Sequence, residues 1–339
     1  MKHDWTRREC LKFGVTAGLG GAIVGLPSLA PLASAQASGP EPGTNGEKGI
    51  PVRYLEAGLA ALANTWRGYW GNGHYGAAAI SAYFFARDLA LDERTCKAMQ
   101  AELDAFREAG KSLFEFETPK EEATPERVAE IVRSLEKGID QSRAAGHDVI
   151  FAALALKAFH HAPALAKPQW IDGIVKLDLH LRERFGADAD TEFNRAHPIA
   201  KWQTPQELVE STFACFMRPS LGGPVGLIHG ITHADAVAEL WELGHESLAA
   251  RGGEALKVHI NLDPSLAQPE PALGERVPDS PLSHRFWENP TVRNATWGFR
   301  GHTFKFPYSY YRRRTAIRDA ALREQCDARA LAVLGSVVR

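Results

Sequence analysis

The sequence predicts an all-α protein: an α/α toroid-like helical array built from about four repeated units, in which buried helices form an inner ring and amphipathic helices wrap it. Three observations carry this prediction. Helix-start signals are frequent, strand alternation is rare, and the predicted helices are of two kinds. The best strand candidate, residues 258–262, is short. An irregular helical bundle is the alternative architecture.

Two predicted helices are apolar nearly all round. Residues 75–86 contain no charged side chain, and residues 149–159 contain only Lys157. Helices of this kind must be buried on every side. The amphipathic helices that would cover them are residues 93–108, 124–137 and 169–184.

Helix starts are marked by capping residues. Thr124 precedes Pro125, a typical first helical residue, and Thr204 stands three residues before Glu207, the spacing of a capping box. Both signals predict a helix that begins at the proline following the threonine.

Four histidines introduce apolar or aromatic runs at nearly even spacing. His74, His147, His229 and His302 are separated by 73, 82 and 73 residues. This spacing predicts four copies of one supersecondary unit, each with a histidine at the N-terminus of its inner helix. Coincidence among the chain's other histidines is the alternative.

Four such imidazoles would converge near the axis of the ring. A buried polar group without a partner costs about 1–3 kcal/mol, so four would cost roughly 4–12 kcal/mol, against about 5–15 kcal/mol for the stability of a whole domain. A divalent metal satisfies them, because neutral imidazole is its commonest protein ligand. We therefore predict a metal held by His74, His147, His229 and His302.

Lys305 stands three residues after His302 in an otherwise uncharged segment. A buried ammonium beside a dication would lose its proton, and the neutral amine can bind carbon dioxide as a carbamate that offers the metal an anionic oxygen. Imidazoles with one carboxylate-like ligand suit Fe(II), with Mn or Zn as alternatives. A lysine that snorkels to the surface is the other interpretation.

His233 lies four residues after His229, on the same face of a helix. It is predicted either as a further ligand or as a group that faces the substrate, and we favour the second. Asp148 and Tyr75, each next to a predicted ligand, complete the predicted catalytic set. Asp148 could orient a ligand imidazole, and Asp235 and Glu239 could do the same near His229.

Four short motifs together resemble those of questin oxidase-like proteins, in order and approximate spacing. They are Asn72-Gly73-His74-Tyr75, Gly146-His147-Asp148, His229-Gly230-Ile231-Thr232-His233 and His302-Thr303-Phe304-Lys305. The resemblance implies an all-helical non-haem iron oxygenase that uses O2 on a polycyclic aromatic or quinone-like substrate. It also implies His74, His147, His229, His302 and a carboxylated Lys305 as ligands. Pro307 departs from the family pattern and predicts a break in the helix after the lysine.

Aromatic residues gather near the first and last histidines and are predicted, as a group, to wall a pocket for a flat apolar substrate. They are Trp66, Tyr69, Trp70, Tyr75, Trp297, Phe299, Phe304, Phe306, Tyr308, Tyr310 and Tyr311. The charge run Arg312, Arg313 and Arg314 is predicted to be a solvated helix face. His259, in a polar segment, is predicted to be structural or solvated.

The N-terminus resembles a twin-arginine export signal. Arg7 and Arg8 precede a Gly-rich apolar stretch and then the small residues Ala33, Ser34 and Ala35. We expect residues 1–35 to be the signal peptide, residues 36–50 a flexible leader, and residues 51–339 a single all-helical catalytic domain. The expected location is periplasmic or secreted, the expected partner is the twin-arginine export machinery, and no stable membrane anchor is expected.

Charge and cysteine content exclude some classes. Without residues 1–35 the chain keeps 35 Lys+Arg against 39 Asp+Glu, with no basic stripe, so nucleic acid is not an expected partner. The remaining cysteines, Cys96, Cys215 and Cys326, are an odd number without paired spacing and predict no disulfide framework.

The predicted function is a metal-dependent oxygenase acting on an apolar or aromatic small molecule. Three alternatives stay open. One is a metal-dependent hydrolase in which His147 and Asp148 act as in histidine-aspartate phosphohydrolases. Another is a metal-free toroidal lyase or isomerase with His74 and Asp148 as acid and base. The last is a non-catalytic binding protein.

Overall fold

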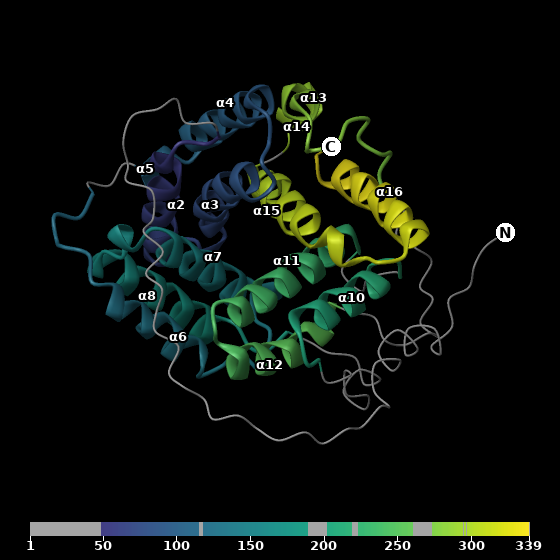
Figure 1. Cartoon of the computed structure of the whole chain (residues 1–339). Coiled ribbons are helices and arrows are strands. Elements are labelled where there is room, and N and C mark those ends of the chain that lie inside the picture. Colours follow the sequence, from purple (N-terminus) through teal and green to yellow (C-terminus); the bar gives the residue numbers. More distant parts are fainter. Residues whose placement is uncertain are drawn as a thin grey trace, which may run out of the picture.

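The computed structural model describes residues 49–114, 118–188, 202–218, 223–259, 273–293, 295 and 297–338. Within these residues every regular element is a helix, so the predicted all-α class is confirmed (Figure 1). The predicted signal peptide and most of the predicted leader lie outside the described residues. None of the described helices has the length and apolarity needed to cross a bilayer.

Four helices form a closed inner set. They are α3 (Gly73–Asp88), α7 (His147–His161), α11 (Gly223–Glu242) and α15 (Trp297–Arg313). Contacts run from α3 to α7, from α7 to α11, from α11 to α15 and from α15 back to α3. Each of the four carries one of the spaced histidines. Figure 1 places them in the middle of the molecule, with the other helices around them.

The outer helices pack against this inner set. In chain order they are α2 (Val52–Asn64), α4 (Glu93–Ala109), α5 (Lys111–Phe114), α6 (Ala129–Leu135), α8 (Pro168–Arg184), α10 (Pro205–Phe216), α12 (Glu246–Ala255), α13 (His284–Glu288), α14 (Pro290–Arg293) and α16 (Ala320–Val337). Helices α2 and α4 pack on α3, helices α6 and α8 on α7, helices α10 and α12 on α11, and helix α16 on α11 and α15. The two predicted kinds of helix therefore occupy the two predicted positions.

Short 3-10 helices connect these elements. They are η1 (Thr65–Arg67), η2 (Trp70–Asn72), η3 (Pro125–Val128), η4 (Ala144–Gly146), η5 (Pro163–Leu165), η6 (Leu256–His259) and η7 (Arg314–Ala316). Two of them, η2 and η4, lead directly into the inner helices α3 and α7.

Several local predictions can be compared with the structure. The Thr204 side chain accepts a hydrogen bond from the Glu207 backbone N–H at 3.2 Å, which confirms the predicted cap. Thr124 makes no such bond, and the chain after it begins as the 3-10 helix η3. The predicted strand is wrong where it is described, because Val258 belongs to η6; residues 260–262 lie outside the described residues.

The predicted break at Pro307 is also wrong. Helix α15 continues through Pro307 to Arg313. Proline removes one backbone hydrogen bond from a helix interior. The side chains of residues 301–310 are all buried, and tertiary packing of this kind overrides the local preference.

The predicted N-terminal position of the histidines holds for two of the four. His147 is the first residue of α7 and His74 the second of α3, but His229 is the seventh of α11 and His302 the sixth of α15. Helices α11 and α15 start more than one turn earlier than the spacing predicted. The four-copy repeat therefore stays a prediction.

Candidate metal centre

The four spaced histidines meet inside the inner set of helices. The Nε2 atom of His74 lies 3.1 Å from that of His147 and 3.4 Å from that of His302. The Nε2 atom of His229 lies 3.2 Å from that of His302. His74, His147 and His302 each offer a nitrogen within 4.8 Å of the others, so these three buried side chains could hold a metal ion. His229 adjoins this triad through His302.

Backbone carbonyls orient two of the rings. The Nδ1 atom of His74 lies 2.9 Å from the carbonyl oxygen of Gly71, and Nδ1 of His147 is hydrogen-bonded to the carbonyl of Ala144. A carbonyl only accepts, so each Nδ1 carries the hydrogen and each Nε2 carries a lone pair. These hydrogen bonds at Nδ1 fix the tautomer in which the Nε2 lone pair is available to a metal.

The turn before His147 has an unusual backbone. Ala144, Ala145 and Gly146 have φ angles of 49°, 58° and 77°, in the left-handed region that alanine seldom adopts. Asp188 secures this turn, since its carboxylate accepts hydrogen bonds from the Ala145 N–H at 2.9 Å and the Ser142 hydroxyl at 2.6 Å. Strain of about 1–3 kcal/mol per residue is typical of functional sites, and here the turn presents the Ala144 carbonyl to His147.

The glycine before three of the histidines makes room for a neighbour. A Cβ atom on Gly73 would lie 2.5 Å from the Phe151 ring, and one on Gly301 would lie 2.7 Å from Cβ of His74. A Cβ on Gly146 would lie 2.6 Å from Nδ1 of His233. The Gly-His pairs of the sequence thus allow the inner helices to approach closely enough for the rings to meet.

Burial keeps the cluster neutral. Desolvation lowers the pKa of His74, His147 and His229 well below the ordinary histidine value, and the nearby Lys305 lowers all three further. Lys305 is 1% exposed, and its Nζ lies 3.4 Å from Nε2 of His147. Desolvation lowers the pKa of Lys305 to about 7. The predicted surface alternative for Lys305 is therefore wrong.

Two aromatic rings pack against the cluster, one of them from the predicted aromatic group. The ring of Trp70 packs against His147 at 5.1 Å, and Phe151 packs against His147 at 5.0 Å and His74 at 5.8 Å. Phe151 was not predicted, although its place one turn after His147 on the same helix face could have identified it.

Other members of the predicted aromatic wall pack elsewhere. Phe304 stacks on Trp287 at 5.0 Å, and the hydroxyl of Tyr310 donates to Asp327 at 2.7 Å. Both serve the contacts between α15 and the outer helices. The side chains of Trp297 and Phe299 lie outside the described part of the structure.

Two predicted catalytic residues do not join the cluster. The ring of Tyr75 stacks on Phe106 of α4 at 4.3 Å, so it fills the core between α3 and α4. Asp148 has a buried Oδ1 atom without a partner, and burial raises its pKa to about 7. The charges that act on Asp148 belong to Asp178, Arg143 and Asp188. Consecutive helical residues do not share a face, and the carbonyl of Ala144 orients His147 instead.

His233 is fully buried, and neither of its ring nitrogens has a hydrogen-bond partner. Its ring lies 5.5 Å from that of His259, which in turn lies 6.0 Å from His229. The Nε2 atom of His259 is also buried without a partner, and desolvation lowers the pKa of His259 to about 4. Of the two predicted alternatives for His259, structural or solvated, this burial contradicts the solvated one. His259 lies outside any apolar helical run, so no sequence pattern indicates that it lies near His233 and His229.

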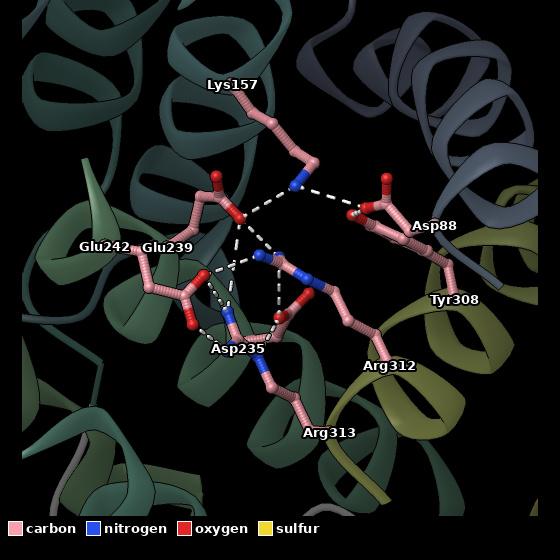
Figure 2. A network of polar contacts seen from close by, with 8 residues as sticks. All are labelled: Asp88, Lys157, Asp235, Glu239, Glu242, Tyr308, Arg312 and Arg313. Atoms are coloured by element: carbon pink, nitrogen blue, oxygen red, sulfur yellow. Dashed lines mark hydrogen bonds and ion pairs between the residues drawn. The ribbon is translucent and has the colours of Figure 1, made fainter. Parts of the chain in front are cut away.

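The far ends of the inner helices carry a network of ion pairs (Figure 2). Lys157 lies 3.2 Å from Asp88 and 3.1 Å from Glu239. Arg312 pairs with Asp235 at 3.2 Å, with Glu242 at 2.6 Å and with Glu239. Arg313 lies 2.6 Å from Asp235 and also pairs with Glu242.

This ion-pair network overturns two predictions. Arg312 and Arg313 are not a solvated face, since their side chains are only 15% and 11% exposed. Arg314 is exposed further and pairs with Asp327 at 2.6 Å. Asp235 and Glu239 do not orient His229, because their carboxylates form ion pairs with Arg312, Arg313 and Lys157. The helix period explains the error, since six and ten residues separate them from His229.

A comparison of the chain with known protein families, with curated proteins and with solved structures found no match to any of them.

Proposed function

We propose that the protein is a metal-dependent oxygenase. Its metal would be non-haem Fe(II), with Mn or Zn as alternatives, and its substrate an apolar, polycyclic aromatic or quinone-like small molecule. The ligands would be His74, His147, His229, His302 and Lys305, the last as its carbamate. The support comes from the histidine cluster, from the environment of Lys305 and from the resemblance of the four motifs.

The contact between His74 and His147 carries the proposal. Both Nδ1 hydrogens are directed at carbonyls, so the two Nε2 atoms face each other at 3.1 Å with lone pairs only. Two acceptors at that distance repel, and a cation between them removes the repulsion. Ligands at about 2.1 Å from one ion lie roughly 3.0 Å apart at a right angle and 3.4 Å apart in a tetrahedron. The observed separations of 3.1, 3.2 and 3.4 Å match that range.

Lys305 adds a reason for a carbamate. Its Nζ lies 3.4 Å from a nitrogen that would itself bind the metal, and an ammonium there would oppose a dication. A carbamate replaces that positive charge with an anionic oxygen at the same place. Several imidazoles with one anionic oxygen form a ligand set suited to Fe(II).

The surroundings favour oxygen chemistry over hydrolysis. Trp70 and Phe151 cover the imidazoles with apolar rings, which limits water at the site. Asp148, which a histidine-aspartate phosphohydrolase would require beside the metal, interacts with Arg143 and two other aspartates instead. When bound, iron supplies the electrons that activate O2, while the protein holds the geometry. His233, with two nitrogens lacking partners, is the candidate for contact with the substrate.

The first experiment is anaerobic reconstitution of the purified protein with Fe(II), followed by O2-uptake measurements with a panel of quinones and polycyclic phenols. The expected result is substrate-dependent uptake that the Zn-loaded protein does not show. Phosphate release from a parallel panel of phosphate esters, without O2 uptake, would favour the hydrolase. Absence of bound iron would overturn the proposal.

Export through the twin-arginine pathway is a second part of the proposal, because it would deliver the protein already folded with its metal. The supporting motif is Arg7 and Arg8 followed by an apolar stretch and Ala33-Ser34-Ala35. Replacement of both arginines by lysine should retain the full-length chain in the cytoplasm of a host that has this pathway. Unchanged periplasmic recovery would contradict it.

A further inference from the structure

The four inner helices run in the same direction, from the histidines to the ion-pair network. On three of the four helices a residue of the ion-pair network stands ten residues after the histidine. These residues are Lys157 on α7, Glu239 on α11 and Arg312 on α15. On α3 the network residue is Asp88, fourteen residues after His74. The histidine cluster and the ion-pair network are therefore two ends of one axis.

A small cavity lies on this axis between the two ends. All four inner helices line it, with Ser81 from α3, Leu154 from α7, Ala236 from α11 and Ser309 from α15, each seven residues after its histidine. Lys305 lines the same cavity. The Nζ atom of Lys305 also lies 3.4 Å from Nε2 of His147, so this side chain joins the cavity to the histidine cluster.

The size of the cavity restricts what enters it. Its volume is about 20 Å³, room for about one small molecule but far too little for a polycyclic substrate. The hydroxyl of Ser81 is buried there and has no hydrogen-bond partner in the protein. That unpartnered group indicates that the cavity holds a small molecule able to form a hydrogen bond.

The charge of the ion-pair network further restricts which molecules can enter the cavity. The ion-pair network drawn in Figure 2 joins three cations, Lys157, Arg312 and Arg313, to four carboxylates, those of Asp88, Asp235, Glu239 and Glu242. Within these residues one negative charge remains in excess. An anion such as bicarbonate is repelled at this end, whereas a neutral molecule is not.

We propose that this cavity is the route by which neutral carbon dioxide reaches and leaves Lys305, an inference that rests on the proposed carbamate. In the reaction, the lone pair of Nζ forms a bond to the carbon of CO2, and one C=O π pair moves to oxygen. One N–H proton leaves to solvent water. No oxidant or reductant is needed.

The experiment measures how fast the carbamate exchanges its carbon. The full protein is equilibrated with carbon-13 bicarbonate and carbonic anhydrase, its carbamate signal is recorded by NMR, and the label is then diluted with unlabelled bicarbonate. Ser81→Leu and Ala236→Leu fill the cavity from different helices. Each should slow the exchange about tenfold, which corresponds to about 1.4 kcal/mol on the barrier. The matched control Ala332→Leu adds the same bulk at a buried alanine of α16 that does not line the cavity, and it should exchange at the rate of the parent protein.

Leu154→Ala, which widens the cavity, should accelerate exchange and does not depend on how the core tolerates a larger side chain. Circular dichroism and metal content verify that each variant retains the fold and the site. Equal exchange rates in all four variants would overturn the route while the labelled carbamate still stands. A parent protein without any labelled carbamate would overturn both the route and the carbamate in the proposed function, whereas the histidine-bound metal would be unaffected.

Discussion

The two ends of the inner helices contain polar clusters of opposite character, and the histidine cluster is the more deeply buried. At the ion-pair end, every cation has carboxylate partners and every carboxylate has cations. Burial alone would raise the pKa of Asp235, but Arg312 and Arg313 lower it below its ordinary value. At the histidine end, neutral Nε2 atoms face one another with lone pairs.

The two clusters differ in whether their polar groups find partners within the protein. Each charged side chain of the ion-pair network pairs with a side chain of opposite charge, so no bound ion or ligand is needed to complete these contacts. In the histidine cluster, carbonyls accept the Nδ1 hydrogens of His74 and His147, so the lone pairs of their two Nε2 atoms face each other. Three of these side chains, those of His74, His147 and His302, lie close enough together to hold a metal ion.

Removal of a histidine should have the largest effect. His74 contacts both His147 and His302, so His74→Ala should weaken metal binding at least about 100-fold. Metal content after dialysis, measured by mass spectrometry, checks this. His161→Ala is the matched control, because His161 is bonded to Tyr83 outside the cluster. Equal metal content in the two variants would show that the cluster is not the site.

Removal of one arginine should damage stability but not metal content. Arg313→Met leaves Asp235 and Glu242 with less compensation in a buried network and should destabilise the fold by about 3–5 kcal/mol. Urea denaturation measures the change. If metal content fell in step with stability while the protein stayed folded, the two ends would not be independent.

Neutralisation of Asp148 should stabilise the protein in a pH-dependent manner. Burial raises its pKa to about 7, so between the unfolded value of about 3.9 and pH 7 the folded state binds the extra proton. Stability is lost as the pH rises through this window. Asp148→Asn should therefore add about 2–4 kcal/mol at pH 8 and almost nothing near pH 4. Thermal unfolding at both pH values checks it, and a gain independent of pH would contradict the assignment.

Relaxing the turn before His147 should have the smallest effect. Ala145→Gly removes left-handed strain and should change stability by at most about 1 kcal/mol. Ala90→Gly is the matched control, because Ala90 also has a positive φ of 48° but lies at the end of α3, away from His147. Calorimetric titration with Zn should show severalfold weaker binding for Ala145→Gly only. Equal affinities would mean that the turn does not preorganise His147.

Much of the fold could be predicted from the sequence, because a helix without charged side chains, such as residues 75–86, is stable only when it is buried on every side. The convergence of the histidines followed from their even spacing and their positions before apolar runs. The role of Pro307 could not be predicted, since tertiary packing decided it.

The errors at the site have a common physical origin. Sequence adjacency suggested that Asp148 and Tyr75 act beside their neighbouring histidines, but successive helical residues point about 100° apart. His259 reaches His233 and His229 through a 3-10 turn, a contact that no periodic pattern announces. The charge run predicts a solvated face for Arg312 and Arg313, because their carboxylate partners lie more than 70 residues away in the sequence.

The most direct test is X-ray absorption spectroscopy of the protein reconstituted with iron. The account predicts imidazole scattering from at least three histidines, with nitrogen at about 2.0–2.2 Å, and one imidazole fewer on any iron that remains bound in His74→Ala. Iron surrounded only by oxygen ligands, or an unchanged number of imidazole ligands in that variant, would contradict it.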